Sequence, residues 1–272
     1  MSAMAEPNPY RLDFDGRVEE FVRHRRVHPE VLHHLLACGL FGPETRVLDV
    51  GCGTGNYAAA LSESTGCLVS GVDPSRRMLD SARDAAQWES LAHGSAESLP
   101  FGDDSFDVIM STDVIHHIVD RDAYFRQAVR VLRPAGHILT VTDSHEDISR
   151  RRPLSSHFPE TVGVELQRYP PVPGLLEEMA RAGFVEPRLV EVSHNYDLDD
   201  IQAYRDRAFS SLLLIEDEEF RCGIGRLEAD LARGSIPCVS LYTVIWGTAP
   251  GVESASHQSW HVRCHDKGQG LR

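Results

Sequence analysis

A glycine-rich segment preceded by a carboxylate is chemically the most informative part of the sequence. Residues 47–55 read VLDVGCGTG, so glycines stand at alternate positions directly after an apolar run. Glycine lets the backbone turn sharply and leaves no side chain between the chain and a ligand. In open α/β sheets, ligands bind at the carboxyl ends of the strands. We therefore expect a ligand to lie across this turn.

The glycine spacing and the preceding Asp49 indicate the type of ligand. A dinucleotide site has the spacing G-x-G-x-x-G, whereas this segment has G-x-G-x-G. The Asp49 carboxylate would repel a phosphate but suits the cationic end of an amino acid. S-adenosylmethionine (SAM) carries an ammonium and a sulfonium and no phosphate. Electrostatics therefore favour SAM over NAD, and the spacing argues against an NAD(P)-dependent enzyme.

A second carboxylate, Asp73, ends the next apolar run, 22 residues after Gly51. A carboxylate at this point can accept two hydrogen bonds from ribose hydroxyls. It could equally serve as a helix N-cap before Pro74 and Ser75. NAD sites also use such a carboxylate, so Asp73 alone does not identify the cofactor.

The elements that must position these residues follow from the alternation of apolar and amphipathic runs. Such alternation is typical of a parallel sheet with helices on both faces. Strands are expected at 46–50, 68–72, 91–93, 106–111, 137–142, 188–193 and 238–246. Helices are expected at 15–26, 29–38, 57–63, 75–87, 121–132, 174–183 and 197–233, the last with Asp199 as N-cap. Segment 146–174 contains five prolines and is expected to form a long loop or lid.

Five segments in a fixed order connect the sequence to a known family. They read VLDVGCGTG, GVDPS, GSAESLPFGDDSFDVIMS, DVIHHI and VLRPAGHILTV, within residues 45–142. On these segments the sequence resembles class I SAM-dependent methyltransferases, in the type 11 branch that includes enzymes of ubiquinone and menaquinone biosynthesis. The resemblance implies a Rossmann-like seven-stranded α/β sheet of order 3-2-1-4-5-7-6 with its last strand antiparallel. Residues 238–246 would form that strand.

The domain organisation expected from this resemblance is one catalytic domain with additions. Residues 1–39 would form an N-terminal helical cover and residues 40–249 the SAM-dependent methyltransferase domain. Within it, residues 145–237 would carry the lid and a helical C-terminal cap insertion. Residues 250–272 are polar and aperiodic, which predicts a disordered tail.

The resemblance also assigns the cofactor site by position. The methionine and ribose parts of SAM, and of its product S-adenosylhomocysteine, would lie against the glycine turn, the end of the second strand and the residue after the fourth. Ala96 and Glu97 would meet the adenine, and Met78 is either an adenine contact or a core residue. The full set is Asp49, Gly51, Gly53, Gly55, Asp73, Pro74, Ser75, Met78, Ala96, Glu97 and Thr112.

Two histidines, His116 and His117, follow the fourth strand near the expected reaction centre. Methyl transfer from a sulfonium is an in-line displacement, so the enzyme must align the acceptor and, if needed, remove a proton. Imidazole titrates near neutrality, so either histidine is a candidate general base. A structural role remains the alternative for both.

Residues outside the core motifs would build the acceptor pocket. The candidates combine aromatic, cationic and imidazole side chains, each of which could instead belong to a solvated surface. They are Tyr10, Arg23, Arg26, His145 and Tyr169.

Composition limits the partners and the function classes. The 272 residues carry a net charge of −14, which disfavours nucleic acid, and no segment is long and apolar enough to span a membrane. We expect a cytoplasmic monomer or homodimer that methylates an O, N or C atom of a small molecule, without a metal. The alternative is a SAM-binding protein that does not methylate: a cofactor-assisted cyclase or decarboxylase, or an inactive binding module. A nucleic-acid methyltransferase is disfavoured further because STDV, and not an Asp/Asn-Pro-Pro-aromatic loop, follows the fourth strand.

Overall fold

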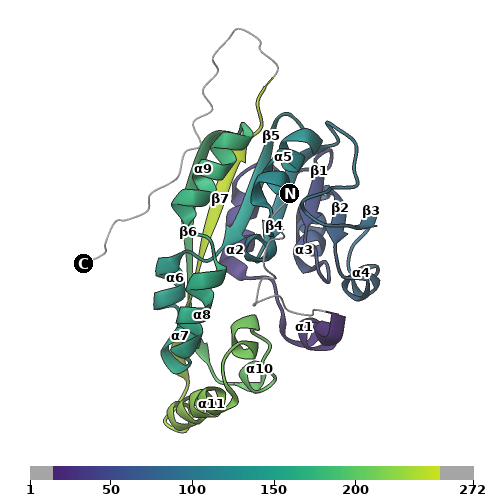
Figure 1. Cartoon of the computed structure of the whole chain (residues 1–272). Helices are drawn as coiled ribbons and strands as arrows, with labels where there is room; N and C mark the ends of the chain where they lie inside the picture. Colours follow the sequence, from purple (N-terminus) through teal and green to yellow (C-terminus); the bar gives the residue numbers. More distant parts are fainter. Residues whose placement is uncertain (1–14, 252–272) are drawn as a thin grey trace, which may run out of the picture.

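Seven strands form one sheet in the computed structural model, which describes residues 15–251 (Figure 1). The strand order is β3-β2-β1-β4-β5-β7-β6. Strands β1 to β5 pair in parallel, and β7 runs antiparallel to both of its neighbours. This confirms the predicted Rossmann-like order and the antiparallel last strand. The strands are β1 (Arg46–Val50), β2 (Leu68–Asp73), β3 (Trp88–His93), β4 (Phe106–Thr112), β5 (Leu132–Thr142), β6 (Val185–Leu198) and β7 (Ile236–Thr248).

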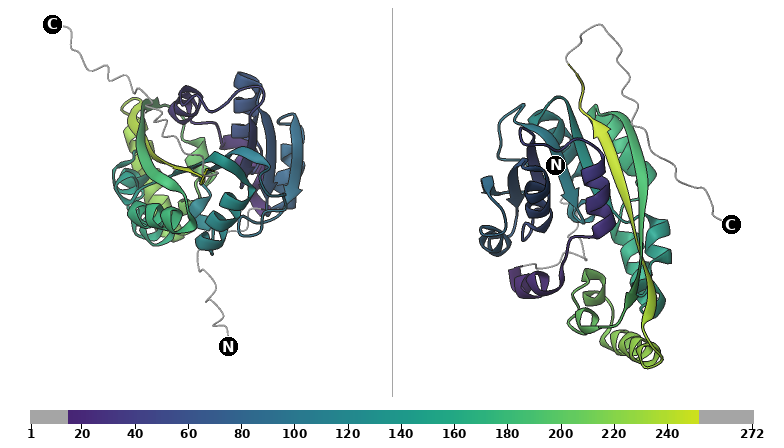
Figure 2. Two further views of the ribbon diagram at one scale, coloured as in Figure 1. Left: turned by 90° about the horizontal axis from the view of Figure 1, so that it is seen from above. Right: turned by 180° about the vertical axis from the view of Figure 1, so that it is seen from behind.

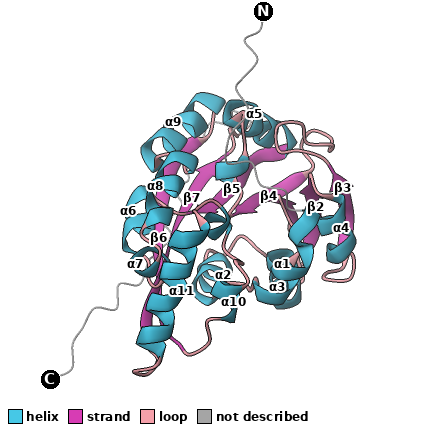
Figure 3. Ribbon diagram, turned by 60° about the horizontal axis from the view of Figure 1, so that its bottom comes forward, coloured by secondary structure: helices cyan, strands magenta, loops and turns pink. Residues whose placement is uncertain are grey.

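Helices cover both faces of the sheet, as a parallel sheet requires, since its strands are apolar on both sides (Figures 2 and 3). Helices α5 (Arg121–Val131) and α9 (Val172–Ala182) bury Tyr124, Phe125 and Met179 on one face. On the other face, α2 (Pro29–Ala37) and α3 (Asn56–Thr65) bury Leu35 and Leu61. Part of the expected N-terminal cover therefore belongs to the sheet packing itself, because α2 contributes fully buried side chains.

Near Trp88, the helix and strand at the edge of the sheet have other bounds than the sequence predicted. Helix α4 (Arg76–Ala82) ends five residues earlier than expected, and β3 begins at residue 88 instead of 91. The Trp88 indole donates a hydrogen bond to the Ala82 carbonyl and occupies the space beside Gly55 and Gly71, where a Cβ would overlap the ring. The large apolar ring is thus held against the sheet, and the backbone of residues 88–90 pairs there with β2.

Segment 146–174 is mostly helical, so the prediction of a long loop was wrong. It contains α6 (His145–Arg150), α7 (Leu154–His157), α8 (Glu160–Arg168) and the start of α9. Pro153, Pro159 and Pro171 each stand at the N-cap of a helix, and Pro173 lies in the first turn of α9. Proline is tolerated there because those N–H groups have no partner within the helix. The prolines separate short helices and do not prevent them.

A helical cap completes the structure beyond the ends of the sheet. It combines α7 with α10 (Gln202–Arg205), a 3₁₀ helix η3 (Ser210–Leu213) and α11 (Asp217–Leu231), so only part of the expected helix at 197–233 forms. Residue 201, and not Asp199, is the N-cap of α10. The cap has its own core, which includes Phe158, Leu212 and Leu227. It packs on the long extensions of β6 and β7 past the end of β5, as Figure 1 shows.

The cap depends on a close approach between α11 and α7, which gives a stability prediction. A Cβ at Gly223 would overlap the Phe158 ring, whereas a Cβ at Gly225, two residues along the same helix, would meet nothing within 4 Å. We expect Gly223→Ala to destabilise the protein by about 1–3 kcal/mol through overpacking. Gly225→Ala is expected to stabilise it by roughly 0.5–1 kcal/mol through helix propensity. Urea unfolding of both variants checks this, and equal effects would contradict the contact.

Candidate active site

A cavity of about 660 Å³ lies at the carboxyl ends of the parallel strands. Its walls come from the turns after β1, β2, β4 and β5, from the segment joining α1 (Val18–His24) to α2, and from the cap. Residues on the extensions of β6 and β7, among them Tyr196 and Tyr242, close the remaining side. The position matches the general rule for ligands in open α/β sheets.

The glycine turn forms the floor of this cavity. Gly51 and Gly53 have φ values of +70° and +52°, a backbone region that side chains disfavour. A Cβ at Gly51 would overlap Val114, so packing alone requires glycine there. A Cβ at Gly53 would meet nothing within 4 Å, although this residue lines the cavity. Packing therefore leaves room above Gly53 for a ligand to approach the backbone.

Two buried carboxylates face the same end of the cavity. Asp73 accepts hydrogen bonds from the backbone N–H groups of Gly53 (2.9 Å) and Ser75 (2.8 Å), which fix its orientation. Burial raises the pKa of Asp73, and burial together with the neighbouring Asp73 charge raises the pKa of Asp49 well above its usual value. Two desolvated like charges repel, so a cationic ligand would relieve an electrostatic cost at this end.

Most of the predicted cofactor residues lie together on the cavity wall. These are Asp49, Gly51, Gly53, Asp73, Pro74, Ser75, Met78 and Thr112. Gly55, Ala96 and Glu97 do not line it. Gly55 allows the Trp88 ring to approach, Ala96 is part of the core, and Glu97 accepts a hydrogen bond from the Val119 backbone at 3.2 Å.

The histidine pair lies in a short 3₁₀ helix η2 (Ile115–His117) and lines the cavity. The two rings are 4.0 Å apart, and His116 also stacks on Tyr169 with centroids 4.0 Å apart. The Nδ1 atom of His116 is buried without a hydrogen-bond partner among the described residues. Burial, aided by nearby arginines, lowers the pKa of both rings, to about 3 for His117. Both imidazoles are therefore neutral at neutral pH and able to accept a hydrogen bond.

The acceptor candidates divide into two groups. Arg26 and Tyr169 line the cavity, whereas Arg23 and His145 do not. Arg23 is an exposed side chain that pairs with Asp206, and His145 bonds the Tyr169 carbonyl at 2.9 Å. Tyr10 lies outside the described residues.

Three acidic residues that sequence reasoning missed form ion pairs in the cavity wall. Arg25 lies 3.4 Å from Asp113, and Arg151 lies 2.6 Å from Asp143 and also contacts Glu165. Asp113 has a φ of +57°, an uncommon conformation for a residue with a side chain. A positional signal existed for two of them, because Asp113 and Asp143 directly follow β4 and β5 at the ligand-binding edge. Arg25 and Glu165 carried no such signal.

Helix α1 contributes Phe21 and His24 to the cavity wall and is attached to the cap. His24 lies 2.6 Å from the Asp206 carboxylate, and Arg17 donates to the carbonyls of Asp206 (3.0 Å) and Arg207 (3.2 Å). In the 3₁₀ turn (Asp15–Arg17) that precedes α1, Asp15 contacts the Ser75 hydroxyl. The N-terminal segment thus connects the cofactor end of the cavity with the cap.

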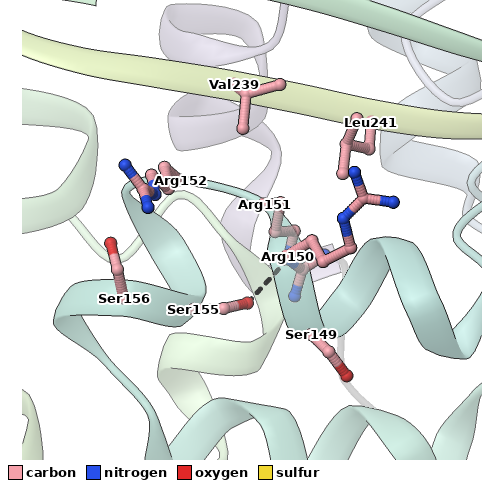
Figure 4. A pocket seen from close by; sticks show the side chains of 8 residues that line it. All are labelled: Ser149, Arg150, Arg151, Arg152, Ser155, Ser156, Val239 and Leu241. Carbon is pink, nitrogen blue, oxygen red and sulfur yellow. Dashed lines mark hydrogen bonds between the residues drawn. The ribbon is translucent and has the colours of Figure 1, made fainter.

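A second hollow, of about 500 Å³, adjoins the cavity at Arg151, Arg152, Val239 and Leu241 (Figure 4). Its three consecutive arginines are not equivalent. Arg150 pairs with Glu146 on the surface, while Arg151 points inward to its buried carboxylates and donates to Ser155 at 3.3 Å. The run is therefore not a uniform solvated face.

Part of the chain matches a known protein family. Residues 48–140 match the family described as a methyltransferase domain. The methyltransferase GfsG of Streptomyces halstedii is 43% identical over 99 residues, which cover 34% of this chain and 36% of GfsG. The aligned parts span between 28% and 53% of the length of the first curated relatives.

Solved structures share the fold over most of the chain. A crystal structure of an Anabaena variabilis protein from an antibiotic biosynthesis pathway has a TM-score of 0.62 at 23% identity, covering 81% of this chain and 98% of that one. Phosphoethanolamine N-methyltransferase 2 of Haemonchus contortus, in complex with S-adenosyl-L-methionine, has a TM-score of 0.56 at 21% identity, covering 87% of this chain and 57% of that one. Within residues 15–251, no helix is long and apolar enough to cross a membrane, and no group of three potential metal-binding side chains was found.

The lowered pKa of His117 predicts a pH-dependent stability. The folded state resists protonation until about pH 3, whereas the unfolded chain takes up a proton near pH 6.5, so stability falls as the pH drops below 6.5. Between pH 7 and pH 5, this one residue should lower the free energy of unfolding by about 2 kcal/mol. We expect His117→Asn to reduce the loss of unfolding free energy between pH 7 and pH 5. His33→Asn, an exposed control, should not reduce it, and identical pH profiles for the two variants would contradict this role of His117.

Proposed function

We propose that this chain, whose residues 48–140 form a methyltransferase domain of class I fold, transfers a methyl group from SAM to a small molecule. The observation that carries the proposal is the pair of buried carboxylates, Asp49 and Asp73, beside a glycine turn with open space above Gly53. A ligand that is cationic, carries ribose hydroxyls and lacks phosphate fits this combination. S-adenosylhomocysteine would be the product.

The residues fit SAM on both charge and shape. When bound, SAM supplies a methyl group already activated by a positively charged sulfur. Asp73, held by two backbone N–H groups, retains lone pairs that can accept hydrogen bonds from ribose hydroxyls. Asp49, 3% exposed, would balance the amino-acid end of the cofactor. Met78 and Pro74 supply apolar surface on the same wall.

Catalysis would require alignment of the acceptor and, for O–H and N–H acceptors, removal of a proton. When the acceptor is held close to the methyl group and in line with it, most of the acceleration of methyl transfer comes from this orientation. The buried Nδ1 of His116 has no partner among the described residues and is available to accept that proton. Tyr169 stacks on this ring and restricts its orientation.

The acceptor is proposed to be metabolite-sized. The cavity is enclosed by α1 and the cap, and its volume lies within the range of about 300–1,000 Å³ common for small-molecule sites. A relative from Actinopolyspora halophila, 30% identical over 169 residues, is named a glycine/sarcosine/dimethylglycine N-methyltransferase. We propose an O, N or C atom of a small molecule as the methyl acceptor, without involvement of nucleic acid.

The state of the cysteines bears on the cellular compartment of the protein. The described cysteines Cys38, Cys52, Cys67, Cys222 and Cys238 are all free thiols, which suits a reducing compartment. We propose a cytoplasmic enzyme that acts as a monomer or homodimer.

Calorimetric titration tests the cofactor. Wild type should bind SAM and S-adenosylhomocysteine and not NAD, because the carboxylates favour cations and repel phosphates. Asp73→Ala should raise the Kd of both adenosyl ligands by roughly tenfold to a hundredfold, which is the usual effect of losing charged hydrogen bonds. Asp80→Ala, at an exposed carboxylate paired with Arg83, is the control and should bind normally. Absence of adenosyl binding in folded wild type would refute the proposed function.

Replacement of the histidines tests the proton acceptor. With an acceptor found by screening for release of S-adenosylhomocysteine, His116→Ala should lower kcat by about 10²–10⁴-fold if proton removal is part of the slow step. Its cofactor affinity should be unchanged, and His117→Ala is compared in the same assay. Full turnover in both variants would exclude a histidine base. Cofactor binding without a methylated product from any acceptor would favour the non-methylating alternative.

A further inference from the structure

The last residue of α8, Arg168, is a buried cation without an acidic partner among the described residues. The residue is 7% exposed, and its only side-chain hydrogen bond among the described residues runs from Nη1 to the Ser210 hydroxyl, at 3.3 Å. Its Nη2 atom is buried and has no partner within residues 15–251. No carboxylate lies within ion-pair distance of it in the described part of the chain, although Arg25 and Arg151 both have such partners.

An unpaired buried guanidinium is electrostatically costly, because desolvation penalises the charged form. Burial lowers the pKa of Arg168, and the neighbouring Arg151 charge lowers it further. Arginine keeps its charge in proteins, so the cost cannot be removed by loss of a proton. Binding of an anion would relieve it.

Arg168 does not itself line the cavity, but residues directly beside it do. Tyr169, the next residue, and Ser210, its hydrogen-bond partner, both line the cavity. Ser211 also lines it, is 1% exposed, and has a hydroxyl oxygen without a partner among the described residues. The Arg168 charge helps to lower the pKa of both His116 and His117, which indicates that it lies close to the histidine pair.

We propose that Arg168, together with the hydroxyls of Ser210 and Ser211, binds an oxyanion of the methyl acceptor, either a carboxylate or a phosphate monoester. This inference rests on the proposed function and specifies its substrate class. Guanidinium and hydroxyl groups together supply the donors that such an oxyanion accepts. The atom to be methylated then lies between this anchor and the cofactor, beside His116.

The charges of the cavity support this orientation. Asp49 and Asp73 lie together at one end, where a cationic cofactor would stabilise their charged forms. Asp113, Asp143 and Glu165 are already engaged by Arg25 and Arg151. Arg168, beside the cavity residues Tyr169 and Ser210, has no such partner among the described residues, although the whole chain carries a net charge of −14.

The hollow of Figure 4 is a weaker candidate for an anion site and provides the control. Its Arg150 is 62% exposed in its side chain and already pairs with Glu146 at 2.7 Å. An arginine with a carboxylate partner in solvent has little need of a further anion. Arg150→Met therefore removes the same charge as Arg168→Met without affecting the proposed anchor.

The test measures anion binding to the full chain saturated with S-adenosylhomocysteine. The probes are inorganic phosphate and acetate, each compared with chloride at equal ionic strength, with thermal unfolding as the readout. Wild type and Arg150→Met should be stabilised by one or both probes. In Arg168→Met the apparent Kd for the probe should rise by about tenfold to a hundredfold, the usual effect of losing a charged hydrogen-bond donor. A response to phosphate alone indicates a phosphate monoester, and a response to acetate alone indicates a carboxylate.

Two further readouts distinguish an anion anchor at Arg168 from a purely structural arginine. Without any anion, Arg168→Met should unfold at the same or a higher temperature than wild type, since it removes an unpaired buried charge; a merely structural arginine would give a lower temperature. Affinity for S-adenosylhomocysteine should be the same in all variants. If that ligand binds but neither probe stabilises wild type, or both stabilise Arg168→Met equally well, the anion site is refuted while the proposed function stands. If S-adenosylhomocysteine does not bind wild type, the proposed function itself fails.

Discussion

The structure around the cavity depends on ion pairs between arginines and carboxylates from distant parts of the chain. Arg25 precedes α2, and its partner Asp113 follows β4. Arg151 follows α6, and its partners are Asp143 after β5 and Glu165 in α8. Arg151 and its partners are buried, so removal of one of them would leave an uncompensated charge, whereas Arg25 and Asp113 are only partly buried. Both sets of ion pairs connect segments that are far apart in the chain. They position the N-terminal segment and the cap over the carboxyl ends of the strands.

The same electrostatic principle divides the cavity into two functional ends. Asp49 and Asp73 are buried together at one end, with no arginine of residues 15–251 within ion-pair distance, and burial raises the pKa of each. Beside Tyr169 and Ser210 of the cavity wall, Arg168 is buried without a carboxylate partner among the described residues. Each end thus bears an electrostatic cost that a ligand of opposite charge would offset. His116 and His117 also line the cavity, and burial favours the neutral form of both rings.

Several functional residues were predictable because short sequence spacings determine their local geometry. The turn at Gly51 and Gly53 directly follows a strand, and Asp73 ends the next one, so their convergence at one edge of the sheet follows from parallel pairing. Segment 146–174 was predicted to be a loop because a proline in the interior of a helix breaks that helix. Here they stand at helix N-termini, where the missing N–H costs nothing.

The sequence alone determined the glycine turn and the carboxylates at strand ends, because these depend on residue types and hydrophobic periods within short segments. The strand order followed from the resemblance to a known family and not from any local pattern. Only the tertiary structure decided which side chains from distant segments meet: Tyr169 on His116, Arg25 beside Asp113, and Arg168 against Ser210 without an acidic partner in the described chain. The physical reason is that such contacts depend on how helices pack against the sheet and against each other. Residue type and spacing along the chain carry little information on that packing, and the acceptor end of the cavity consists almost entirely of such contacts.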